Sequence, residues 1–171
     1  MNMKTTSGVT AGAILTLLVG LTSVDCGAMN PNAPDSNASV SVNSDFTADK
    51  AFCVDEVNRL RASVGKPPLT RSHSIETFSS EAARVDGDAH ETHKFFRQTN
   101  GGGVARAENE IPWWALSRYG SVRTIIRDGL ANEWSEGPGG SHWENITGNY
   151  SEVACGVSIK DGEVTVTQDF H

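Results

Sequence analysis

The C-terminal residues of the chain alternate between apolar and polar side chains, and this alternation limits the fold more than any other sequence feature. Residues 153–159 carry an apolar side chain at every second position. In residues 164–170, three of the four positions with this spacing are apolar, namely 164, 166 and 170. Residues spaced in this way share one face of a β-strand. Asp161-Gly162 lies between the segments, and Asp-Gly is a strong signal for a two-residue hairpin turn. We therefore predict a C-terminal antiparallel hairpin. Its core face consists of Val153, Cys155, Val157, Ile159, Val164, Val166 and Phe170.

Three upstream segments carry apolar residues at helical spacing. They are residues 49–64, a stretch from Ile75 toward His90, and residues 121–134, where Ser121 is a suitable N-cap. Gly-Lys-Pro-Pro ends the first helix and Glu-Gly-Pro-Gly-Gly ends the third. Residues 105–111 are predicted to be a short strand or extended segment that Pro112 ends. Helices that are separate in sequence from a hairpin-built sheet indicate a layered α+β domain.

The N-terminal part of the chain has the pattern of an exported protein. Residues 9–24 are apolar apart from small residues, which is the size of a secretory signal and too short for a membrane span. We predict a signal peptide at residues 1–25. Residues 26–45, rich in Asn, Ser, Ala and Pro, are predicted to be a polar linker or tether, and residues 46–171 the folded domain. The expected location is secreted, periplasmic or cell-surface.

The three cysteines support two separate expectations. Cys26 follows the apolar region, where a lipoprotein carries its acylated cysteine, but the preceding Ser-Val-Asp departs from the usual small-residue box. Two interpretations stay open, a lipid anchor at Cys26 or a cysteine beside an ordinary cleavage site. Cys53 and Cys155 form an even pair in an exported chain, which favours one disulfide. In the loop-entropy model such a long closure stabilises a fold by about 4–5 kcal/mol.

Composition limits the partners of the chain. With 171 residues it is long enough for one domain with a core and too short for two. The net charge is −7, and the chain has no cluster of Lys and Arg. Nucleic acid is therefore excluded as an expected partner. Contact with a membrane is expected only through a lipid at Cys26, and the domain is expected to act as a monomer.

Four short segments carry a further pattern. They are residues 57–69 (VNRLR followed by GKPPL), 107–110 (AENE), 134–146 (a Trp followed by HWENI) and 149–157 (NYSEVACGV). In this order and spacing they resemble the CAP family (cysteine-rich secretory protein, antigen 5, pathogenesis-related 1), also called the SCP domain, in its bacterial type. Ala107 stands where the family motif G-E-N has Gly. The resemblance spans about residues 50–170 and implies a three-layer α-β-α sandwich with an antiparallel sheet.

The resemblance also implies a cleft with two His and two acidic residues, which binds a divalent metal in some members. Glu108 matches the Glu of the G-E-N motif, and His142 matches the His of the G-H motif. The first His is expected at the end of the second helix. His93 fits it better than His90 because a bulky pair, Phe-Phe, follows at the expected place.

The final carboxylate of the cleft has two candidates. Glu133 and Glu136 flank Trp134, whereas Gly137 occupies the position that carries the acid in many eukaryotic members. Imidazoles and carboxylates are ligands that zinc accepts, so a site for zinc or another divalent cation is expected, with no other cofactor. The expected metal ligands are His93, Glu108 and His142.

Three functional hypotheses follow. The leading one is a non-enzymatic exported CAP protein whose cleft binds a small or lipid-like ligand, with or without a divalent metal. The chain has no G-x-S-x-G or H-E-x-x-H motif, which favours binding over catalysis. The alternatives are a metal-assisted extracellular hydrolase or protease using the same cleft, and a structural surface module. Trp113-Trp114 is either the wall of a groove for an apolar or sugar ligand or a buried aromatic pair.

Overall fold

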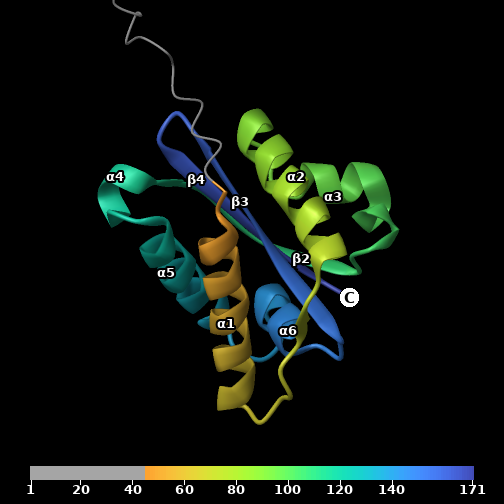
Figure 1. Cartoon of the computed structure of the whole chain (residues 1–171). Helices are drawn as coiled ribbons and strands as arrows, with labels where there is room; N and C mark the ends of the chain where they lie inside the picture. Colours follow the sequence, from red (N-terminus) through yellow and green to blue (C-terminus); the bar gives the residue numbers. More distant parts are fainter. Residues whose placement is uncertain (1–44) are drawn as a thin grey trace, which may run out of the picture. The chain divides into compact units, whose positions relative to one another are not determined.

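The computed structural model describes residues 45–171, which form helices packed on a single sheet of four strands (Figure 1). The predictions for residues 1–44, including the signal peptide and Cys26, lie outside the described residues. Within residues 45–171, every helix is too short or too polar to cross a bilayer. The helices are α1 (Thr47–Ser63), α2 (His73–Ala89), α3 (Lys94–Thr99), α4 (Leu116–Tyr119), α5 (Val122–Trp134) and α6 (Ser141–Thr147). The strands are β1 (Thr70–Arg71), β2 (Ala107–Ala115), β3 (Glu152–Lys160) and β4 (Glu163–Phe170).

The sheet is built around the predicted C-terminal hairpin, which is confirmed. β3 and β4 pair antiparallel up to Lys160 and Glu163, and the two turn residues between them have φ angles of 50° and 83°. Positive φ at both positions is what the Asp-Gly turn provides. The strand order is β1-β3-β4-β2, so β2 is an outer strand. The two-residue β1 adds a parallel pairing to β3 that the sequence did not predict.

Two layers of helices enclose the sheet, so the predicted α+β class is confirmed. α1, α5 and α6 contact one face, and α2 lies on the other with α3 beside it (Figure 1). The alternating residues of the hairpin face α1 and α5 and are buried, with Val153, Val164 and Phe170 fully inaccessible. Ile159, close to the turn, is 39% exposed and does not join this core.

The opposite face of the sheet lies very close to α2. An ideal Cβ on Gly156 of β3 would lie 1.9 Å from the backbone oxygen of Ser79 in α2. The Thr167 hydroxyl donates a hydrogen bond to that same oxygen at 2.9 Å. Only glycine permits this approach, so the helix backbone rests directly on the strand.

The disulfide predicted between Cys53 and Cys155 is present. It links α1 to β3 across 102 residues of sequence, and both cysteines are fully buried. The bond therefore joins the first helix to the central part of the sheet.

The prediction that Pro112 ends its strand was wrong. β2 continues to Ala115, with a register shift between Ile111 and Trp114 that leaves Pro112 and Trp113 as a bulge. Trp113 has a φ of 54°. Pro112 has no N–H to donate, which an outer strand tolerates because one edge has no neighbouring strand. The sequence also missed α3, α4 and α6, none longer than seven residues.

A fully buried arginine connects α1 to α6. The Arg61 Nε donates to the Pro67 carbonyl at 2.9 Å. Its Nη1 donates to the carbonyls of Ile146 and Gly148 at 2.6 and 3.0 Å, at the C-terminal end of α6. Arg61 is only 1% exposed and Ile146 is fully buried, so the Ile146 carbonyl receives from Arg61 a hydrogen bond that water cannot supply.

We expect Arg61→Ala to lower the free energy of unfolding by about 3 kcal/mol or more, because the buried Ile146 carbonyl loses its donor and a fully buried side chain is removed. Urea unfolding of the two proteins measures this difference. Arg59→Ala is the matched control, since Arg59 is exposed and pairs with Glu56 on the same helix. It should change the same quantity by less than about 0.5 kcal/mol. Equal effects of the two substitutions would contradict the role of Arg61.

Candidate functional site

Two carboxylates on the outer strand form the base of the site. Glu108 and Glu110 are two residues apart on β2, so both side chains point to the face that α2 covers. Asn109 between them points to the opposite face. The side chains of Glu108 and Glu110 are 1% and 0% exposed.

His93 reaches these carboxylates from the turn that follows α2. The helix ends at Ala89, and His90 and His93 adopt left-handed backbone conformations with φ of 48° and 55°. His93 thus lies at the start of α3, four residues beyond α2, and not at the helix end as predicted. The Asp86 carboxylate accepts a hydrogen bond from the Phe95 backbone N–H at 2.8 Å, which fixes the turn.

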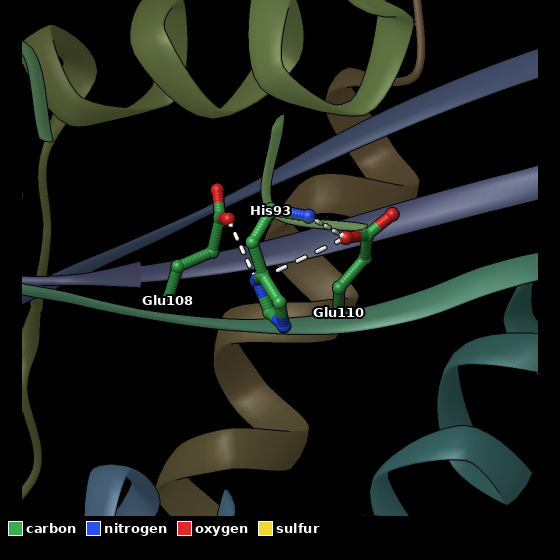
Figure 2. A group of neighbouring side chains, drawn as sticks. All are labelled: His93, Glu108 and Glu110. Atoms are coloured by element: carbon green, nitrogen blue, oxygen red, sulfur yellow. Dashed lines mark hydrogen bonds and ion pairs between the residues drawn. The ribbon is translucent and has the colours of Figure 1, made fainter. Parts of the chain in front are cut away.

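The three side chains converge on one point (Figure 2). The Nδ1 of His93 lies 2.9 Å from Glu108 Oε1 and 3.9 Å from Glu110 Oε2. The backbone N–H of His93 also donates to Glu110 Oε2 at 2.7 Å. The ligand atoms of all three residues lie within 4.8 Å of one another. Among residues 45–171, these three side chains are the ones whose ligand atoms lie close enough together to hold a metal ion.

Burial changes the acidity of both carboxyls. Burial, together with the nearby charges of Asp86 and Glu110, raises the pKa of Glu108 to about 8. Burial raises the pKa of Glu110 to about 7, although the backbone N–H of His93 favours the ionised form. Glu108 Oε2 and Glu110 Oε1 have no hydrogen-bond partner among the described residues. A proton or a cation is therefore needed to compensate their charge.

His142 and Glu136 form a second, more exposed pair. His142 lies in the first turn of α6, and its Nδ1 is 2.5 Å from Glu136 Oε1. Its backbone N–H donates to Glu136 Oε2 at 3.0 Å. The hydrogen bond from His142 holds the pKa of Glu136 below its usual value. Glu136 therefore orients the His142 ring and leaves its Nε2 free.

Glu133, the other candidate carboxylate, is buried on the core side of β2. It belongs to α5 and is 3% exposed. Asn109 Nδ2 donates to it at 3.4 Å, and the Gln168 amide, oriented to satisfy both groups, donates at 2.8 Å. Burial raises the pKa of Glu133 to about 8, against the effect of these two amides. This raised pKa favours the protonated, uncharged form of Glu133 at neutral pH.

Two adjoining cavities follow the outer edge of β2, and His93 and His142 line both of them. The first has a volume of about 300 Å³ and includes Glu110 and Glu133 in its lining. The second has a volume of about 320 Å³ and includes Glu108. The two histidines therefore stand at the boundary between the cavities.

Of the predicted metal ligands, the structure brings His93 and Glu108 together and places His142 outside the 4.8 Å group. His142 lines the same cavities, so its role in binding stays a prediction. Sequence reasoning missed Glu110. A signal for it existed, because the second Glu of the Ala-Glu-Asn-Glu segment lies two positions after Glu108 and so shares its strand face.

Comparison with known proteins decides the family. The model of the cysteine-rich secretory protein (CAP) family matches residues 54–170. The chain belongs to this family. A crystal structure of a cysteine-rich secretory protein from Staphylococcus aureus aligns with 73% of the chain at 14% identity and a TM-score of 0.47. The chain covers 39% of the length of that protein. No curated protein matches the sequence.

The motif segments of this CAP domain meet around Asn109. Its Oδ1 accepts a hydrogen bond from Asn145 Nδ2 at 2.8 Å, and its Nδ2 donates to the backbone oxygen of His142 at 3.2 Å. Both partners belong to α6. Asn109, located between the two site carboxylates, thus holds the helix that carries His142 against β2.

Ionisation of Glu133 should make the fold less stable as the pH rises. Its pKa is about 8 in the folded state and 4.5 as the ordinary value, so the folded form keeps a proton that the unfolded chain loses. The free energy of unfolding therefore falls with rising pH between these values. Glu133→Gln cannot ionise, so between pH 5 and 7.5 its free energy of unfolding should gain about 3 kcal/mol relative to wild type.

Urea unfolding at the two pH values, with a chelator present, measures the change. Asp128→Asn on the same helix is the control, because Asp128 is exposed. It should follow the wild-type pH dependence. A constant difference between Glu133→Gln and wild type across this range would show that Glu133 does not hold a proton.

Proposed function

We propose that the protein is an exported CAP protein whose cleft binds a divalent cation, with zinc the best match, and holds a small ligand beside it. The observation that carries the proposal is the convergence of His93, Glu108 and Glu110 within 4.8 Å at the boundary of two cavities. The disulfide and the family are consistent with an extracellular protein. Export through residues 1–25 remains part of the proposal, and both interpretations of Cys26, a lipid anchor or a cysteine beside an ordinary cleavage site, stay open.

The donor set fits zinc. Zinc accepts imidazole nitrogen and carboxylate oxygen at about 2.0–2.2 Å, so two of its ligands lie roughly 3–4 Å apart. The distances from His93 Nδ1 to Glu108 and Glu110, 2.9 and 3.9 Å, are close to this range. The unpartnered oxygens of both carboxyls supply negative charge. A zinc held by three side chains keeps a position for a further ligand, which His142 Nε2 or a bound molecule would occupy.

Binding is favoured over catalysis because the described residues offer no thiol nucleophile. Cys53 and Cys155 are joined to each other and buried. One observation supports metal-assisted hydrolysis as the second candidate. In this alternative His93 and Glu108 hold the cation, and Glu110, which lines the first cavity and has a pKa of about 7, acts as a general base and not as a ligand. Turnover of peptide, ester or glycan substrates by the zinc-loaded protein would establish that alternative.

The proposal predicts that the protein binds one zinc ion per chain. We expect Glu110→Gln and Glu108→Gln to lower zinc affinity by about tenfold or more, because each removes a ligand. Isothermal titration with zinc, together with the zinc content of dialysed protein, measures the effect. Affinity should also fall as the pH drops through about 8 to 7, where protons begin to occupy both carboxyls.

The control for this experiment is a His/Glu pair outside the cleft. His90 Nε2 lies 2.8 Å from Glu163 Oε2, and both side chains are exposed. Glu163→Gln should leave zinc affinity unchanged. Zinc binding that is equally strong in Glu110→Gln and Glu163→Gln, or no zinc binding by the wild-type protein, would overturn the proposal.

A further inference from the structure

The first cavity has two chemically different walls. Pro112 and Trp114 of β2 supply an apolar wall. Thr92, Asn132 and Glu133 supply a hydroxyl, an amide and a neutral carboxyl. The cation site accounts for neither the aromatic wall nor the polar groups on α5.

The bulge in β2 places Trp114 in this cavity. Adjacent residues of a strand point to opposite faces, and the register shift pairs Trp114 with Val164, so that Trp114 is the indole on the face toward α5. Trp113 stacks on the exposed His90 ring at a centroid distance of 5.1 Å, and its Nε1 donates to the Asp86 carbonyl. Trp114 instead stacks on Tyr119 of α4 at 4.7 Å and lines the cavity. The Tyr119 ring therefore holds Trp114 in a fixed orientation.

The charge of the cavity excludes several ligand classes. Glu110 lines it as well, and the polar wall carries no Lys or Arg. Away from the two histidines and the proposed cation, a phosphate or other anion would find no basic partner in this cavity. An acyl chain would leave the Thr92 hydroxyl and the Asn132 amide in the cavity without partners, which costs free energy. A neutral ligand with one apolar face and several hydroxyls satisfies both walls.

We propose that this cavity is a subsite for one ring of a neutral oligosaccharide. The C–H face of the ring packs on Trp114, and its hydroxyls hydrogen-bond to Thr92, Asn132 and Glu133. The shared walls at His93 and His142 let the glycan continue into the second cavity, where Asn145 and Arg97 line the path. This inference rests on the proposed function, because it names the ligand class of the same cleft.

The test titrates the full-length mature protein, with and without zinc, with chitotriose, cellotriose and maltotriose. We expect at least one trisaccharide to bind more tightly than about 1 mM by isothermal titration. Trp114→Ala should weaken that binding by about tenfold, since it removes the aromatic wall. Trp113→Ala, the matched control, should leave the affinity within about twofold because its indole lies outside the cavity.

A second variant covers the case in which Trp114→Ala does not fold. Asn132 is exposed on α5, so Asn132→Ala should fold normally and weaken trisaccharide binding by about threefold or more. Absence of binding by all three sugars, binding of a fatty acid in their place, or equal losses in Trp113→Ala and Trp114→Ala would overturn the inference. Zinc binding without sugar binding would overturn the subsite and leave the proposed cation site standing. Sugar binding without zinc binding would overturn the proposed cation site and leave the sugar subsite standing.

Discussion

The contact between α2 and β3 at Gly156 determines where the site residues lie. Because the helix backbone rests directly on the strand, with no side chain between them, the height and direction of α2 over the sheet are fixed. Gly87, near the end of α2, repeats this fit, since a Cβ there would lie 3.0 Å from the Thr165 hydroxyl. The turn after α2 must then emerge above β2, and His93 is delivered to Glu108 and Glu110. A Cβ at Gly156 would displace the helix and, with it, the histidine.

The same close packing buries several carboxyl groups next to one another at the site, where their charges repel. The face of the sheet beneath α2 carries Glu108, Glu110 and Asp169, and Asp86 approaches from the helix. Burial, followed by the charge of Glu108, raises the pKa of Asp169 well above its usual value. Carboxyls this deeply buried lower stability when ionised, unless a cation is present. Several buried carboxyls side by side in a small domain are more typical of a binding site than of a structural core.

Local sequence patterns were sufficient to predict the helices and strands whose apolar residues recur at a regular spacing. The hairpin and the three long helices follow from spacing and turn chemistry, and the disulfide from an even pair of cysteines in a chain expected to be exported. The resemblance to CAP proteins then predicted His93, Glu108 and His142 as metal ligands. The sequence could not separate Glu133 from Glu136, because they lie on either side of the last residue of α5. Only the packed structure shows that one is buried beneath Asn109 and the other turns toward His142.

Pro112 shows why strand order limits what a sequence can reveal. A proline ends a central strand but is tolerated in an outer one, and the position of β2 at the edge depends on contacts between distant segments. An exposed edge also risks pairing with another chain, and a proline with a bulge prevents this. In this protein the bulge has a second effect, because it directs Trp114 into the cavity and Trp113 away from it. The bulge that protects the edge of the sheet thus also shapes the cavity wall that a ligand would contact.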